Sequence, residues 1–400
     1  MTTTRRALVA AGVALPVAAR AQALPAWEAV LREARGKPVF CNAWAGDDRT
    51  NAFLAWTAGR LGELHGIDLR HVRLRDTSEA VARVVAEKAA GRNSGGSVDL
   101  IWINGPNFLA MKGQGLLFGP VLDRLPNARF VDREGKPATV VDFTVPVDGL
   151  AVPWRMAQVV FIHDSARVPA PPRSMRAMAD WARAHPGRMT HPQVRNFMGV
   201  TFLKQALVEL APDPTALMRP VEEATVAPAS AALWAWYDAL RPALWRAGRA
   251  FPESGPAQRP LLLDGEIDLY ISFSPAEAAV SIANGQLPPT ARSFVLDGGT
   301  IGNASFLAIA YNAANTSAAM VAADFLLGAE AQARAQDPAV LGAATVLDIA
   351  ALPEADRARF DAAATHPAML SGAALGRALP EPHPSWMTRI TAEWERRYGR

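Results

Sequence analysis

The sequence has few of the residues and motifs that catalysis or metal binding would need. Its one cysteine, Cys41, lies in the apolar run 38–41, which predicts a buried thiol and leaves no partner for an intramolecular disulfide. The seven histidines include no pair at the spacing of a zinc site. A Gly-rich phosphate-binding loop and a Gly-x-Ser-x-Gly elbow are also missing. We therefore assign no metal, no cofactor and no catalytic residue.

The sequence also lacks an apolar run of the length that crosses a membrane, about 20 residues. At its start, Arg5 and Arg6 precede a short segment of small apolar residues, 7–19, and Ala21 and Ala23 form a small-x-small pattern. This order predicts an export signal, residues 1–23, cleaved after Ala23. The paired arginines resemble a twin-arginine signal, with the general export route as the alternative. No cysteine follows the cleavage site, so we expect a mature protein without a lipid anchor, free in a bacterial periplasm.

Without the predicted signal, the chain has no excess of positive or negative charge. The full sequence has 41 Lys and Arg against 38 Asp and Glu, and Arg5, Arg6 and Arg20 lie in the signal, so the mature part has 38 of each. A balanced charge gives no reason to expect nucleic acid or an acidic membrane surface as a partner. About 377 mature residues exceed what one hydrophobic core usually holds, which predicts two lobes.

Strand-like and helical patterns alternate through the first part of the mature chain. The patterns predict strands at 38–43, 68–74 and 98–103, with helices at 49–64 and 79–90 between them. Such a series is typical of a parallel sheet layered with helices. Ligands of these sheets bind beyond the carboxyl ends of the strands, which here are the segments 42–48 and 104–108. Trp44, Trp102 and Asn104 lie at these ends, either as site residues or as core and turn residues.

A second alternating unit begins near residue 152. Pro153 and Trp154 precede an apolar strand at 159–162, and a matching strand is predicted at 267–273. If both strands cross between the lobes, they form a hinge over a cleft that closes around a ligand. Core strands within one lobe are the alternative.

Six segments of the chain carry a resemblance to a known family: 37–50, 99–105, 112–118, 186–199, 265–275 and 298–312. In this order and spacing they resemble the solute-binding proteins of bacterial ABC importers. More narrowly, they resemble the thiamine-type or uncharacterised branch of family 1, and the resemblance extends from about Gly36 to about Asp348.

The resemblance implies an α/β periplasmic-binding-protein type II fold, with two lobes joined by two crossing strands around a ligand cleft. We expect lobe 1 to comprise residues 24–155 and 273–312. Lobe 2 would comprise 156–272 and 313–400, including the C-terminal helices. By the same resemblance, the cleft would contain Trp44, Asp47, Asn104, Asn107, Trp154, Arg155, Asn196, Phe197, Ser272, Ser274, Glu277 and Asn303.

The function that this resemblance implies is capture of one small polar or aromatic solute. We expect a monomer that delivers the solute to an ABC permease and, through it, to an ATPase. Thiamine, a cation, would suit Asp47, Asp48 and Glu277, whereas Arg155 and Arg195 favour a carboxylate or phosphate. The alternative function is a secreted carbohydrate-processing enzyme that uses a pair of carboxylates.

Overall fold

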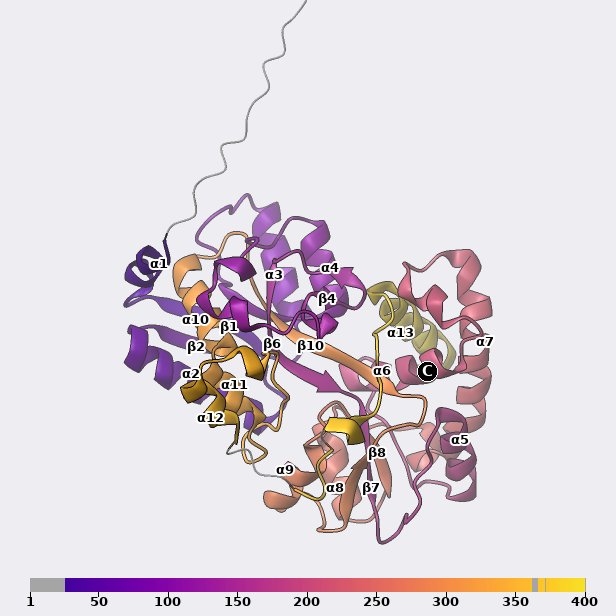
Figure 1. Cartoon of the computed structure of the whole chain (residues 1–400). Coiled ribbons are helices and arrows are strands. Elements are labelled where there is room, and N and C mark those ends of the chain that lie inside the picture. Colours follow the sequence, from indigo (N-terminus) through magenta and orange to yellow (C-terminus); the bar gives the residue numbers. More distant parts are fainter. Residues whose placement is uncertain (1–25, 362–365, 371, 400) are drawn as a thin grey trace, which may run out of the picture.

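The computed structural model describes residues 26–361, 366–370 and 372–399, which fold into two α/β lobes (Figure 1). The predicted signal, 1–23, and its cleavage after Ala23 lie outside the described residues. None of the helices in these described ranges combines the length and the apolar character that a membrane span requires.

Lobe 1 is built on a mixed sheet with the strand order β11-β10-β3-β1-β2, and β6 pairs with β10 outside this path. β1 lies parallel to both β2 and β3, whereas β10 is antiparallel to β3 and β6. The predicted strands at 38–43, 68–74 and 98–103 therefore correspond to neighbours in one sheet. The strands are β1 (Pro38–Trp44), β2 (Asp68–Leu74), β3 (Leu100–Ile103), β6 (Ala151–Gln158), β10 (Thr300–Ile309) and β11 (Ala378–Leu379).

Helices cover both faces of this sheet. One face packs against α1 (Trp27–Ala34), α2 (Asp48–His65), α10 (Thr316–Leu327), α11 (Ala329–Gln336) and α12 (Glu354–Asp361). The other packs against α3 (Ser78–Ala89) and α4 (Gly105–Gly113), beside a small hairpin of β4 (Val141–Asp142) and β5 (Val145–Pro146). The sequence fixes the ends of α2 locally, because Asp47 accepts a hydrogen bond from the Thr50 amide and Gly66 adopts a left-handed conformation, φ 66°.

Lobe 2 has a smaller antiparallel sheet of β8 (Leu269–Ser272), β7 (Val160–Asp164) and β9 (Ala291–Phe294). Helices α8 (Arg259–Leu263) and α9 (Glu277–Ala283) cover one face. The other face carries the helices α5 (Met175–Ala184), α6 (Phe197–Leu210), α7 (Glu223–Leu240) and α13 (Pro384–Tyr398). In α5 the buried residues recur at helical spacing, and Ser174 caps the first turn by accepting from the Ala177 amide.

Two connections join the lobes. β6 of lobe 1 runs through Val159 into β7 of lobe 2, and β9 of lobe 2 returns through residues 295–299 into β10 of lobe 1. The Val159 amide donates to the Ile301 carbonyl at 2.8 Å, so the two crossings lie side by side. The second predicted crossing strand, 267–273, is therefore wrong. It forms β8, which stays in lobe 2 because it pairs with β7 and packs Tyr270 into that lobe's core.

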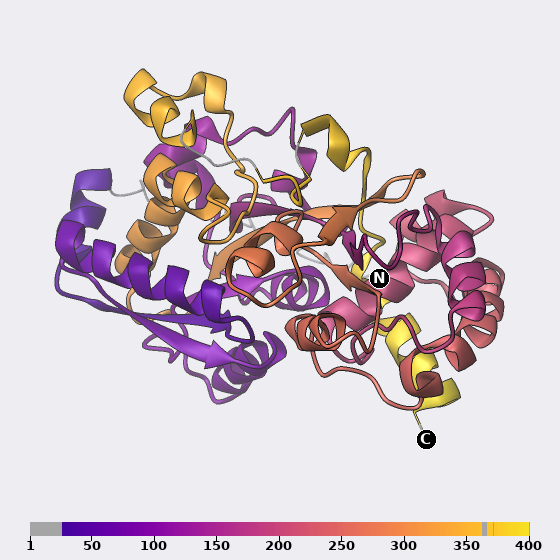
Figure 2. The same ribbon diagram turned by 90° about the horizontal axis from the view of Figure 1, so that it is seen from below.

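The lobe boundaries also need a correction. Residues 273–299 belong to lobe 2, because α9 and β9 pack with β7 and β8. Residues 313–361 belong to lobe 1 rather than lobe 2, because α10 packs against α1 and β1. Figure 2 shows the orange helices α10 and α11 beside the indigo start of the chain, whereas the yellow α13 lies with the pink helices of lobe 2. α13 thus packs on lobe 2 as predicted, and Ala368, Leu370 and Leu375 also pack against the core of that lobe.

Candidate functional site

A cavity of about 630 Å³ lies between the lobes. Its lobe 1 wall comes from the carboxyl ends of β1 and β3 and from the first residues of α2, α3 and α4. The crossing strands β6 and β10 contribute to the wall between the lobes. Lobe 2 adds residues from α6, α8, β8, α9 and the C-terminal helix α13. Segments far apart in the sequence therefore meet around one space.

Eleven of the twelve predicted site residues line this cavity. They come from both lobes and from the crossing strands: Trp44, Asp47, Asn104, Asn107, Arg155, Asn196, Phe197, Ser272, Ser274, Glu277 and Asn303.

Trp154 is the predicted site residue that the structure places elsewhere. It is 2% exposed and its ring stacks on Phe53 in the lobe 1 core, with the ring centres 6.0 Å apart. Trp154 is also the extra residue where the pairing of β6 with β10 shifts register, since Ser305 faces Arg155 and Phe306 faces Pro153. Such a bulge turns neighbouring side chains in new directions. Here it sends the indole of Trp154 into the core, so Trp154 does not belong to the cavity wall.

Aromatic side chains line both lobes of the cavity. Trp44 and Trp102 of lobe 1 meet edge to face, with ring centres 6.4 Å apart. Phe197 and Phe273 of lobe 2 make a similar contact at 5.7 Å. These rings offer flat apolar area to a solute, while nearby asparagine and serine side chains offer donors and acceptors. The arrangement suits a small solute that has both an apolar face and polar groups.

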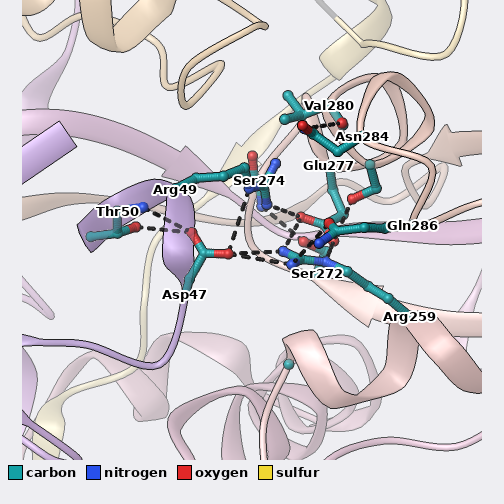
Figure 3. A network of polar contacts seen from close by, with 12 residues as sticks. Asp47, Arg49, Thr50, Arg259, Ser272, Ser274, Glu277, Val280, Asn284 and Gln286 are labelled. Carbon is teal, nitrogen blue, oxygen red and sulfur yellow. Dashed lines mark hydrogen bonds and ion pairs between the residues drawn. The ribbon is translucent and has the colours of Figure 1, made fainter. Parts of the chain in front are cut away.

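Four charged residues connect the lobes across the cavity, and we call them the cleft quartet: Asp47, Arg49, Arg259 and Glu277 (Figure 3). Arg259 of lobe 2 donates to Asp47 Oδ1 of lobe 1, with N···O distances of 3.3 Å. Arg49 of lobe 1 donates to Glu277 Oε2 of lobe 2 at 3.1 Å. Within lobe 2, Arg259 Nε donates to Glu277 Oε1 at 2.6 Å. Each carboxylate therefore faces one guanidinium from its own lobe and one from the other.

These pairings keep both carboxylates ionised. Burial alone would raise the pKa of Asp47, but Arg49, Arg259 and two hydrogen bonds from Thr50 outweigh it and hold that pKa below its usual value. Burial also opposes ionisation of Glu277, and Arg259 and Arg49 again bring its pKa below normal. The quartet is therefore a fully charged and internally balanced set.

Several cavity residues were missed from the sequence. Arg49 was missed although it lies two residues after the predicted Asp47, in the first turn of α2. Arg259 begins a helix of five residues and has no local signal. Met387, Thr388 and Thr391 enter the cavity on α13, which the sequence pattern did not connect with the cleft.

The described parts of the chain contain no group of three His, Cys, Asp or Glu side chains close enough to hold a metal ion. The carboxylates of Asp47 and Glu277, which line the cavity, are instead paired with arginine. Cys41 is buried, which raises the pKa of its thiol to about 12 and leaves it an unreactive core residue.

The family model of the bacterial extracellular solute-binding proteins matches residues 56–361. The chain belongs to this family. Protein YnjB of Escherichia coli K12 is 41% identical over 373 residues, which cover 93% of this chain and 94% of that protein.

Solved structures of solute-binding proteins share the fold. The binding protein AfuA of Actinobacillus pleuropneumoniae, with fructose 6-phosphate bound, has a TM-score of 0.63 at 14% identity and covers 91% of this chain and 99% of its own. The TpPotD lipoprotein of Treponema pallidum has a TM-score of 0.64 at 13% identity and covers 91% of this chain and 100% of its own. The type II periplasmic-binding fold expected from the sequence is confirmed.

This solute-binding protein is thus a component of an ABC importer, as the resemblance predicted. Proteins of this class bind small solutes, act with a permease and its ATPase, and work outside the cytoplasmic membrane, in the periplasm of Gram-negative bacteria. The alternative of a carbohydrate-processing enzyme finds no support among these relatives.

Proposed function

We propose that this solute-binding protein captures one small solute in the cavity between its lobes and delivers it to a membrane permease. The observation that carries the proposal is the placement of aromatic and polar side chains from both lobes around one space beside the crossing strands. A solute there would contact both lobes at once. It would therefore favour the closed arrangement of the lobes over the open one.

The wall residues suggest how the solute is held. A flat part of the solute would lie against Trp44 and Trp102, with Phe197 closing from lobe 2. Asn104 and Ser272 would supply hydrogen bonds to its polar groups. Closing would exclude water from these contacts, which strengthens each of them.

The proposal also covers the export, location and oligomeric state of the protein. We infer that residues 1–23 direct export, that cleavage follows Ala23, and that the mature protein works as a monomer in the periplasm. Thiamine remains a solute to test, because Trp44 could stack on its rings and the quartet carboxylates could face its charge.

Capture of solute from a cell extract tests the proposal. The mature protein, freed of bound solute, is dialysed against the small-molecule fraction of a bacterial extract, and retained compounds are identified by mass spectrometry. The wild type should retain one compound. Trp44→Ala and Phe197→Ala should each retain about tenfold less, since each removes most of a stacking surface worth about 1.4 kcal/mol. Thiamine and its phosphates are added as separate probes.

A matched control separates binding from folding. Trp245 is partly buried in lobe 2 and lies outside the cavity, so Trp245→Ala should retain the compound like the wild type. Failure of the wild type to retain any compound, or equal loss in all three variants, would contradict the proposed site.

A further inference from the structure

The charges that line the cavity do not balance. Beside the quartet, the cavity is lined by one more arginine that has no acidic neighbour in the described part of the chain, Arg155 on β6. The remaining charged residues of the wall cancel, since Arg75 lies beside Asp76 and Arg195 pairs with Glu395 at 2.5 Å. The wall therefore has one positive charge in excess, and that charge belongs to Arg155.

Arg155 has no acidic partner within the described residues. No carboxylate oxygen there lies within 4.0 Å of its guanidinium nitrogens. Its one hydrogen bond to another side chain in these residues is long, 3.4 Å from Nε to Ser305 Oγ. The guanidinium instead lies over two indoles, 4.4 Å from the ring centre of Trp102 and 4.7 Å from that of Trp154.

The protein tolerates this unpaired cation at a cost. Burial lowers the pKa of Arg155 to about 10; the charge of Arg49 adds to this effect and that of Asp47 opposes it. The group is therefore still charged at neutral pH. Stacking on Trp102 returns part of the lost hydration energy. A guanidinium held on two rings has little freedom left, which prepares it to receive a planar acceptor.

Arg49 offers further donors in the same region. Its Nη2 atom bonds to Glu277, but Nη1 is buried and has no hydrogen-bond partner in the described structure. Buried donors without a partner are uncommon and costly. The positive charges of Arg49 and Arg155 repel each other, so a negative group bound to both would stabilise them.

We infer that the solute of this protein carries an acidic group, a carboxylate or a phosphate, that binds to Arg155 and Arg49 beside the ring of Trp102. This inference rests on the proposed function and names the chemical class of its solute. A guanidinium pair forms charge-assisted hydrogen bonds with either group, and one negative charge would neutralise the wall. Unphosphorylated thiamine, a cation, would meet the excess positive charge instead and is disfavoured.

The test uses the capture experiment with variants that change one charge. Arg155→Gln should weaken retention of the captured compound by about 30-fold or more, which is the range for charge-assisted hydrogen bonds. Arg155→Lys should lose less, because the charge stays. Arg124→Gln is the matched control: Arg124 is also partly buried and lies 5.4 Å from an aromatic ring centre, that of Phe118, but outside the cavity. It should change retention by less than about twofold.

The outcomes separate the two proposals. An acidic compound that the wild type and Arg124→Gln retain, and Arg155→Gln loses, supports the inference. Its fragmentation distinguishes a phosphate from a carboxylate. A neutral or cationic compound, or unchanged retention by Arg155→Gln, overturns the inference and leaves the proposed function standing. If the wild type retains nothing, both fail. Melting temperatures of the solute-free variants verify that each is folded.

Discussion

Two groups of charged residues connect the lobes, and they differ in their access to water. The cleft quartet lines the cavity, and its side chains are between 6% and 17% exposed. The second group, which we call the dry cluster, contains Lys204, Glu381 and Asp142, and the cavity residue Asn303 bonds to it. Lys204 and Glu381 are 0% and 1% exposed, and Lys204 Nζ lies 2.6 Å from Glu381 Oε2.

The dry cluster lies beside the crossing strands. Asn303 of β10 donates to Glu381 Oε1 at 3.1 Å. Lys204 of lobe 2 lies 4.4 Å from the ring centre of Phe143 in lobe 1. Asp142 of lobe 1 accepts from Asn104 at 3.1 Å and from the Gly105 amide.

The pKa values of the carboxyl groups are shifted in opposite directions in the two groups. Asp47 and Glu277 of the quartet have lowered pKa values. Burial raises the pKa of Glu381 in spite of Lys204, and it raises that of Asp142 to about 7. The quartet has two guanidinium groups for its two carboxylates. The dry cluster has only one cation, Lys204, near its two carboxyl groups. We interpret the dry cluster as a fixed pivot and the quartet as contacts that open and close with the lobes.

We expect the largest loss of stability when the ion pair of the dry cluster is removed. Lys204→Met leaves the ionised form of Glu381 buried without a cation and should lower the free energy of unfolding by about 3–5 kcal/mol. Urea unfolding of the solute-free protein measures this loss. The double variant with Glu381→Gln should recover part of it, because the unpaired charge is gone. A loss under about 1 kcal/mol for Lys204→Met would contradict the role of a pivot.

A second prediction uses the raised pKa of Asp142. Burial, and to a lesser degree Glu381, raises this pKa from 3.8 to about 7, against the hydrogen bonds from Asn104 and Gly105. The folded state then holds a proton that the unfolded state releases, so Asp142's contribution to stability is complete below about pH 4 and is lost as the pH rises through about 7. The melting temperature of Asp142→Asn should therefore change less between pH 5 and pH 8 than that of the wild type. Asp297→Asn, which neutralises a carboxylate that is 75% exposed, should keep the wild-type profile. Identical profiles for Asp142→Asn and the wild type would refute this assignment.

The smallest expected effect concerns the quartet. Asp47→Asn removes a contact between the lobes but keeps an oxygen that can cap α2. The closed form of the solute-free protein should lose about 1 kcal/mol, which corresponds to about a fivefold shift toward the open form. Small-angle X-ray scattering should then give a larger radius of gyration. Asp48→Asn alters the exposed neighbour and should leave the radius unchanged. Equal radii for the two variants would show that the quartet does not hold the lobes together.

Much of the fold could be predicted because local patterns determine its elements. Alternation of apolar runs located β1, β2 and β3, and helical spacing located α2 and α3, to within about two residues. The partners of these elements could not be read in this way. Strands β8 and β9 are both short and buried, and nothing local says which one precedes a crossing. The alanine-rich α10 is buried on all sides, which predicts a core position without naming the lobe.

The same limit applies to the site. The rule that ligands bind at strand ends located the segments 42–48 and 104–108, because strand ends follow from chain order alone. The resemblance then selected Asp47 and Asn107 within them. Arg259 enters the cavity through tertiary folding and carries no signal in its own neighbourhood. A bulge in β6 decides that Arg155 lines the cavity while Trp154 does not, and a bulge depends on the partner strand.

The distance between the lobes tests the central claim most directly. Leu64 of lobe 1 and Leu263 of lobe 2 are 47% and 44% exposed, so cysteines there can carry a pair of fluorescent labels, while the native thiol of Cys41 stays buried. Energy transfer between the labels is measured with and without the compound captured from extract. We predict a change to a single, narrower distribution of distances when the compound binds. Binding of the compound with an unchanged distribution would contradict closure of the lobes around a solute.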